Sequence, residues 1–259
     1  MTDSPLQVAR HDRIVTLCLN RPRSKNALNR ELVLELGRVL AEVSAQTDVR
    51  AVILTGAGQS FCSGADLKAV TQDPDVDMAE RIDEFHALIR TIVHAPMPFV
   101  AAVDGPAVGF GADLALSCDL RVMTTRAYLQ EKFVNIGLMP DGGGTFWLPR
   151  LVGHGRAMEL LLFGSKIDAG LALHLGLCNR VVEPESLTKT ANDLAATLAK
   201  GPPLALAQIR RSVRESYRGT VEDALEREKE GQLRLLASED LMEGVLAWSE
   251  RRPPEFRGK

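Results

Sequence analysis

Several features that mark other protein classes are scarce or missing in this 259-residue sequence. Aromatic residues make up only 5%, and 31 basic against 34 acidic residues give a formal charge of −3. Without a basic stripe to neutralise phosphates, we expect no nucleic-acid partner. No uninterrupted apolar run reaches the ~18 residues of a membrane span, and the polar N-terminus lacks the core of a signal peptide. We therefore expect no membrane partner and a cytoplasmic location.

Cysteine is scarce too, and its four copies stand singly among apolar residues: Cys18, Cys62, Cys118 and Cys178. No CxxC pair and no histidine pair has the spacing of a metal site, so we predict no bound metal and interpret the cysteines as reduced, buried thiols. The five histidines lie outside any nucleophile elbow, which argues against a hydrolase triad. A pairing of Ser63 with a remote histidine stays open.

Hydrophobic residues at 45% and charged residues at 25% are the proportions of a globular protein with a sizeable core. Apolar runs closed by turn residues predict buried strands at Ile14–Leu19, Ala51–Thr55, Phe99–Val103 and Leu120–Met123. Three- and four-residue periodicity predicts helices from Asn29, near 77–94, and then near 186–199, 203–216, 220–236 and 239–250. The predicted strands therefore cluster in the first two-thirds of the chain and the helices in the last third.

Two glycine-rich turns follow buried strands, one at Gly64-Ala65-Asp66 and one at Gly109-Phe110-Gly111. Such turns direct free backbone N–H groups at an anion, and two of them can stabilise the negative charge of an enolate. A dinucleotide-binding fingerprint is the competing interpretation of the second turn, but its third glycine is Leu114 here. For a single turn, the ordinary explanation is that glycine only lets the chain bend.

Four stretches identify a family resemblance, because their order and spacing are specific: Asn20 to Leu28, Ser60 to Lys68, Ala101 to Asp119, and Gly137 to Gly153. In these stretches the sequence resembles the crotonase (enoyl-CoA hydratase/isomerase) superfamily, over essentially the whole chain. The resemblance implies an α/β fold, a spiral of stacked ββα units with the acyl-CoA site in residues 1–198. It also implies a helical region at 199–259 that forms a homotrimer or a dimer of trimers.

The resemblance further implies an oxyanion hole made by the backbone N–H groups of Ala65 and Phe110. In relatives the second position is normally glycine, so the Phe110 ring must find room. Coenzyme A contacts map onto Arg23, Lys25, Ala27, Ala65, Asp66, Leu67 and Lys68. For Arg23 and Lys25 a solvated turn is an equally ordinary explanation. No metal or redox cofactor is implied, because coenzyme A arrives as part of the substrate.

Carboxylates distinguish the possible reactions. The two glutamates of family hydratases map onto Asp113 and Phe133, so the second is replaced by an apolar side chain that we assign to the acyl pocket. Glu131 lies nearby in a different register and is not assigned a role. Asp141 stands where hydratases commonly have glycine, as in 1,2-epoxyphenylacetyl-CoA and dienoyl-CoA isomerases, where an aspartate shuttles the proton. The sequence therefore predicts an enoyl-CoA isomerase in which Asp141 relays the proton and Asp113 assists or orients.

Other interpretations remain open at this point. The protein could be a hydratase that recruits Asp113 together with Asp141, or an acyl-CoA-binding homologue with little activity. Asp141 could merely cap a helix, and Asp113 could form a salt bridge with an arginine. If Asp113 instead faces the acyl chain, burial would raise its pKa and suit it to proton transfer.

Overall fold

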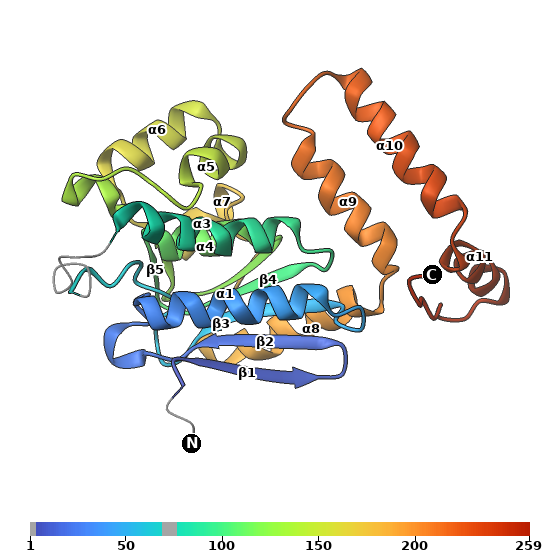
Figure 1. Cartoon of the computed structure of the whole chain (residues 1–259), viewed down its shortest axis with the longest axis horizontal. Coiled ribbons are helices and arrows are strands. Elements are labelled where there is room, and N and C mark those ends of the chain that lie inside the picture. Colours follow the sequence, from blue (N-terminus) through green and yellow to red (C-terminus); the bar gives the residue numbers. More distant parts are fainter. Residues whose placement is uncertain (1–3, 69–76) are drawn as a thin grey trace.

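The computed structural model describes residues 4–68 and 77–259, and it is an α/β protein with a six-stranded and a three-stranded sheet (Figure 1). The larger sheet has the order β1-β2-β3-β4-β6-β9. Its first two strands are antiparallel and the others are parallel. The strands are β1 (Leu6–His11), β2 (Ile14–Leu19), β3 (Ala51–Gly56), β4 (Phe99–Val103), β6 (Leu120–Thr124) and β9 (Arg180–Val182).

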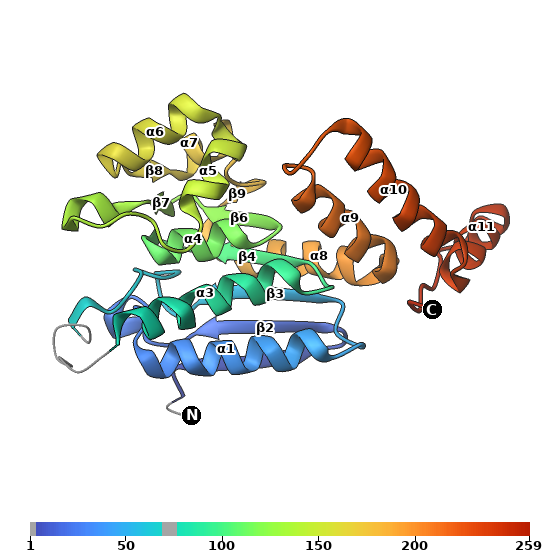
Figure 2. The same cartoon turned by 45° about the horizontal axis from the view of Figure 1, so that its top comes forward.

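Both faces of the larger sheet are covered (Figure 2). Val52 and Leu54 of β3 pack in the cluster that contains α1 (Arg30–Ala45) and α3 (Met78–His94). Ala51 and Ile53 pack in the opposite cluster, with α8 (Leu187–Lys200). Burial on both faces explains why these parallel strands are continuous apolar runs. All the strands and helices predicted from the sequence are confirmed, with ends that differ by at most one residue.

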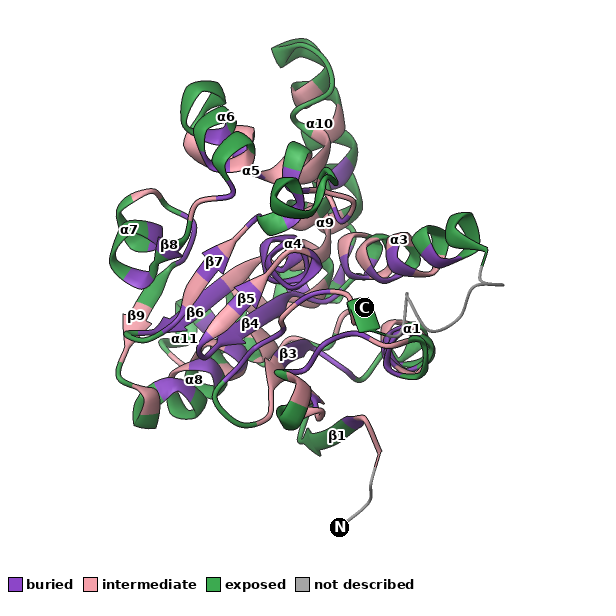
Figure 3. Ribbon diagram, turned by 90° about the vertical axis from the view of Figure 1, so that its left-hand side faces the viewer, coloured by how far each residue is buried: buried purple, intermediate pink, exposed green. Residues whose placement is uncertain are grey.

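The smaller sheet, which the sequence did not predict, consists of β5 (Pro106–Val108), β7 (Tyr128–Gln130) and β8 (Ile167–Asp168). After β5 the chain enters α4 (Phe110–Ser117), and all eight residues of this helix are buried (Figure 3). After β7 come the 3-10 helix η2 (Lys132–Ile136), α5 (Gly144–Val152), α6 (His154–Phe163) and, beyond β8, α7 (Ala169–His174). The small sheet thus places the N-terminus of α4 beside the loops that follow strands of the larger sheet.

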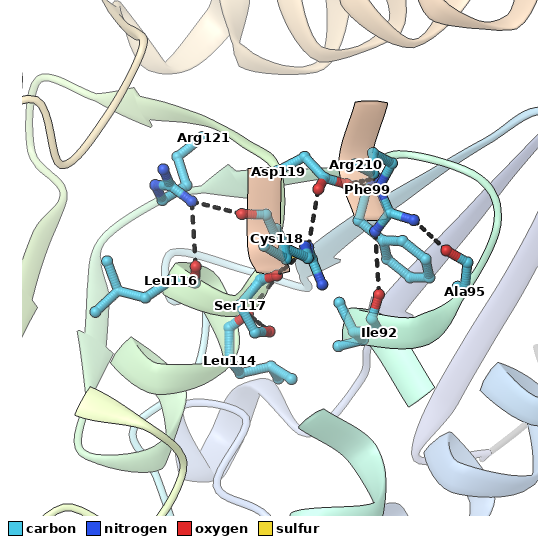
Figure 4. Close-up of polar contacts among 11 residues, drawn as sticks. Ile92, Ala95, Phe99, Leu114, Leu116, Ser117, Cys118, Asp119, Arg121 and Arg210 are labelled. Carbon is cyan, nitrogen blue, oxygen red and sulfur yellow. Dashed lines mark hydrogen bonds and ion pairs between the residues drawn. The ribbon is translucent and has the colours of Figure 1, made fainter. Parts of the chain in front are cut away.

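Helices α9 (Pro203–Glu215), α10 (Val221–Leu236) and α11 (Glu239–Glu250) extend to one side of the sheets (Figures 1 and 2). Arg210 of α9 anchors them to the core. Its guanidinium donates to Asp119 at 2.8 Å, to the Ile92 carbonyl at 3.1 Å and to the Ala95 carbonyl (Figure 4). The Asp119 carboxylate also accepts a hydrogen bond from the Phe99 N–H at 2.8 Å, so the Arg210–Asp119 pair is connected to β4.

The three C-terminal helices leave much apolar surface exposed. In α10 only Gly231 is buried, while Val221, Leu225 and Leu233 are exposed. In α11 the Trp248 side chain is 83% exposed. An apolar surface of this extent is typical of a contact with another protein surface. Among the described residues, no helix is both long and apolar enough to cross a bilayer.

Candidate active site

The loop after β3 carries the first glycine-rich turn, and it is held against the loop after β2. Leu28 N–H donates to the Gly64 carbonyl at 2.8 Å, and Asp66 N–H donates to the Leu28 carbonyl at 3.0 Å. These two bonds bracket Ala65 without using its own N–H. Gly64 has φ +90°, and a Cβ atom there would lie 2.8 Å from the Val108 carbonyl oxygen, so only glycine fits.

The second turn meets the first at this point. Gly109 has φ +54° and donates its N–H to the Gln130 carbonyl at 2.8 Å, which starts α4 at Phe110. A Cβ atom on Gly64 would lie 3.5 Å from the Phe110 nitrogen. In the part of the chain that the structure describes, neither the Ala65 N–H nor the Phe110 N–H donates to a protein acceptor. Two adjoining turns therefore offer two free donors, one of them at a helix N-terminus.

A pocket of about 380 Å³ opens at these donors. Its wall is mostly apolar and includes Ala65, Phe110 and Phe133. Further residues come from α3, from the end of η2 and from the segment after η2: Phe85, Ile136, Leu138 and Asp141. The Phe110 ring turns into the core and makes an edge contact with the Phe85 ring, with 4.5 Å between centroids. The substitution of phenylalanine for glycine is thereby accommodated without removing the backbone donor.

The residues assigned to coenzyme A fall into two groups. Lys25, Ala65 and Leu67 line the pocket. Among the described residues, Arg23, Ala27, Asp66 and Lys68 lie outside its wall. Asp66 is paired internally with Arg21 at 2.9 Å, and the same guanidinium nitrogen donates to the Ala27 carbonyl. Asp66 and Ala27 thus belong to the frame that shapes the loop.

Asn26 belongs to this frame as well, although it was not among the predicted site residues. Its side chain is fully buried, accepts the Arg21 N–H at 2.9 Å, and donates to the Ala57 and Ser60 carbonyls at 3.0 and 2.7 Å. Its backbone has φ +55°, which asparagine tolerates better than most residues. The amide therefore joins the loop after β2 to the loop after β3. An asparagine between Lys25 and Ala27, a residue type that tolerates positive φ, was the available signal.

Asp141 is the carboxylate that lines the pocket. It does not cap a helix, because α5 begins at Gly144 with Gly143 as its N-cap and no side-chain cap bond. Burial raises the pKa of Asp141, and the nearby His86 acts in the opposite direction. Its Oδ1 is buried and has no hydrogen-bond partner in the described chain. A carboxylate in this state is suited to accept a proton.

Asp113 lies behind the pocket wall and is completely buried on α4. It forms no salt bridge among the described residues, so that interpretation is wrong; its Oδ2 accepts the Gly142 N–H at 3.0 Å instead. Burial raises the pKa of Asp113 to about 7, the Gly142 N–H opposes this shift, and the Asp141 charge adds to it. Asp113 therefore holds the turn directly after Asp141.

Glu131, which the sequence analysis left without a role, is brought into the same cluster. It precedes η2 and its side chain is only 3% exposed. Burial raises its pKa well above the ordinary value, and the charges of Asp113 and Asp141 add to the effect. Within residues 4–68 and 77–259, no three histidine, cysteine or acidic side chains are arranged to hold a metal ion.

Comparison with known proteins agrees with this architecture. The sequence profile of the enoyl-CoA hydratase/isomerase family matches residues 9–259, and the chain belongs to this family. It is 37% identical over 250 residues to the 1,2-epoxyphenylacetyl-CoA isomerase of Escherichia coli K12, covering 95% of both chains. It is 33% identical over 244 residues to the short-chain-enoyl-CoA hydratase of Clostridium acetobutylicum, covering 94% of both.

The fold is likewise that of solved structures. An enoyl-CoA hydratase from Bacillus anthracis superposes with a TM-score of 0.93 at 31% identity, covering 98% of this chain and 100% of that one. The crotonase fold predicted from the motifs is thereby confirmed.

Proposed function

We propose that this enzyme is an enoyl-CoA isomerase that moves a carbon–carbon double bond through a thioester enolate. The observation that carries the proposal is the pairing of two free backbone N–H groups, on Ala65 and Phe110, with one pocket-lining carboxylate, Asp141. The substrate class, an acyl-CoA thioester, follows from the names of the family and of its relatives.

In the proposed reaction the Asp141 carboxylate removes a proton from the γ-carbon of a 2-enoyl thioester, or from the α-carbon of a 3-enoyl thioester. The C–H electron pair moves through the carbon chain to the thioester oxygen, and the resulting enolate accepts hydrogen bonds from Ala65 and Phe110. The protonated Asp141 then returns the proton to the other carbon, and the double bond has moved. One base suffices, the atoms balance, and no metal or redox cofactor takes part.

Hydration is the second candidate, since one relative is named a hydratase. It requires a group that activates water and usually a second group that moves the other proton. Phe133 contributes an apolar ring where the second carboxylate would stand, and Asp113 lies behind the pocket wall. These positions favour isomerisation. A binding homologue with little activity is the third candidate, and it makes no use of the free donors.

The aromatic side chains Phe85 and Phe133 in the pocket wall support an acyl group that is unsaturated or carries a ring. We assign coenzyme A to the surface beside Lys25 and Leu67, with Arg23 and Lys68 as candidates for its phosphates. Residues 1–198 would then hold the active site, and residues 199–259 would form a homotrimer or dimer of trimers through the exposed faces of α9 to α11. We place the enzyme in the cytoplasm, where acyl-CoA thioesters are metabolised.

A direct test compares two activities of the purified protein. A 3-enoyl-CoA should be converted to its 2-enoyl isomer, followed by the absorbance of the conjugated thioester, faster than crotonyl-CoA gains water. Brisk hydration without isomerisation would favour the hydratase. Binding of both thioesters without either reaction would favour the binding homologue.

A further inference from the structure

Glu131 is buried with no apparent function in binding or in the proposed proton transfer. It does not line the pocket, and its side chain lies against the N-terminus of α5. A Cβ atom on Gly144 would lie 3.1 Å from Glu131 Oε1 and 2.8 Å from Asp113 Oδ1. The two carboxyl groups therefore flank the same glycine, where a side chain would collide with both.

The hydrogen bonding of this cluster is incomplete. In the described chain, both Glu131 oxygens and Asp113 Oδ1 are buried and have no partner. Asp113 Oδ2 accepts the Gly142 N–H, and the Gly144 N–H also faces this carboxylate and lowers its pKa, although it makes no hydrogen bond of good geometry to Oδ1. A buried acceptor without a donor is costly, and an ionised carboxylate without one is more so. A proton on Glu131 would supply a donor, and Asp113 Oδ1 is an unsatisfied acceptor beside it.

We propose that Glu131 is a positioning residue, a neutral carboxylic acid whose O–H donates to Asp113 Oδ1 and so fixes the carboxylate that holds Gly142 and the turn carrying Asp141. The chain of contacts runs from Glu131 to Asp113, from Asp113 to the Gly142 N–H, and along one peptide bond to Asp141. This inference rests on the proposed role of Asp141 as the base.

The surrounding charges agree with a neutral Glu131. The charged groups that shift its pKa are Asp113 on α4 and Asp141 before α5, and both are acidic. His86 on α3 acts on Asp141. Burial, the largest cause, and the two negative charges all raise the Glu131 pKa, which favours its protonated form.

Two uncharged variants of Glu131 distinguish the loss of its hydrogen-bond donor from a change in charge or in side-chain size. Glu131→Gln keeps an N–H donor for Asp113 at nearly the same volume, whereas Glu131→Met fills the space without a donor. For isomerisation of a 3-enoyl-CoA we expect Glu131→Gln to stay within about threefold of the wild-type kcat. Glu131→Met should lower kcat roughly tenfold or more. KM should stay unchanged, because neither Glu131 nor Asp113 touches the substrate.

A second readout does not depend on catalysis. Carbon-13 NMR titration of the side-chain carboxyls should show Glu131 protonated at pH 7 in the wild type. It should also show the Asp113 pKa higher in Glu131→Met than in Glu131→Gln, because only Gln offers a donor to the charged form. If the wild-type protein isomerises no enoyl-CoA, the proposed function is wrong. The titrations still test whether a protonated Glu131 donates a hydrogen bond to Asp113.

Three results would overturn it. One is a Glu131→Met protein with wild-type kcat and wild-type Asp113 titration. The second is a folded Glu131→Gln protein as impaired as Glu131→Met. The third is a Glu131 carboxyl that titrates as an ionised group at neutral pH in the wild type.

Discussion

The carboxyl group of Asp113 is buried, and burial raises its pKa from 3.8 to about 7. The folded protein thus binds a proton more tightly than the unfolded chain does, so this residue favours folding below pH 4 and progressively less as the pH rises to about 7. Asp113→Asn keeps an acceptor for the Gly142 N–H and carries no charge. We predict that the variant loses less stability than wild type between pH 5 and 8, by roughly 1–3 kcal/mol.

Urea unfolding at fixed protein concentration across this pH range measures the difference. Carboxyl groups with a lowered pKa, such as Glu243 at about 2, act in the opposite sense: they stabilise the folded protein at neutral pH and lose this contribution only as the pH falls below 5. They therefore do not change the pH dependence of stability between pH 5 and 8. Parallel pH curves for wild type and Asp113→Asn would mean that Asp113 does not titrate as we infer.

Gly142 is a residue for which the sequence alone gives no reason beyond flexibility. A Cβ atom there would lie 2.6 Å from the Asp113 Cβ and 2.8 Å from the Phe110 ring. We predict that Gly142→Ala costs about 1–3 kcal/mol of folding free energy, as overpacking does, and also lowers kcat because the turn of Asp141 shifts.

Gly155→Ala is the matched control, since a Cβ atom on Gly155 in α6 would meet nothing within 4 Å. It should change stability by at most about 1 kcal/mol, towards greater stability. Thermal unfolding and steady-state kinetics of the two variants give the comparison, and equal effects would contradict the packing argument.

Among the helices, the attachment of α9 depends on Arg210. This side chain is 9% exposed, pairs with Asp119 and also satisfies the Ile92 and Ala95 carbonyls. Arg210→Ala leaves the Ile92 and Ala95 carbonyls without this donor, while the Asp119 carboxylate keeps Arg214 at 2.8 Å, and we predict a loss of about 2–4 kcal/mol.

One residue further along, Arg211 pairs with Glu215 on the surface and is 61% exposed. Arg211→Ala should cost no more than about 0.5 kcal/mol. Denaturant unfolding of both proteins at one concentration tests the contrast. A loss for Arg210→Ala as small as that for Arg211→Ala would show that other contacts hold α9 to the core.

The strands and helices with strong patterns could be predicted from the sequence because burial itself dictates the pattern. Strand β3 is apolar throughout because both of its faces are covered, and α1 begins after Asn29 because the Asn29 side chain accepts the Leu32 N–H at 3.1 Å. Strand β1 was not predictable in this way. Only Leu6 is buried in it, and it is held at the sheet edge by backbone pairing with β2, which requires no apolar alternation.

The site was predictable where a backbone conformation requires a particular residue, and not where tertiary contacts decide. Gly64 and Gly109 marked the two turns because positive φ favours glycine. Glu131 was passed over because its register differs from that of the family carboxylate. Only the path of the chain through η2 and the missing side chain of Gly144 show that its carboxyl and that of Asp113 flank the same residue.

The assembled molecule is expected to bury the apolar faces of α9 to α11 in a homotrimer or a dimer of trimers. We predict that Leu225→Lys combined with Leu233→Lys, both on exposed positions of α10, shifts the protein towards monomer. Val8→Lys, at an equally exposed apolar position on β1, is the control and should leave the assembly unchanged. Sedimentation velocity at micromolar concentration distinguishes the species, and a wild-type monomer would contradict the expected assembly.

In the proposed mechanism, Asp141 moves a proton while the Ala65 and Phe110 N–H groups hold an enolate. Solvent deuterium exchange into the α- or γ-carbon of an enoyl-CoA reports that enolate directly, whichever acyl group is natural. We predict exchange by wild type, a loss of about 10²–10⁴-fold in Asp141→Asn, and a smaller loss in Asp113→Asn. Exchange that persists at the wild-type rate in a folded Asp141→Asn protein would contradict the account.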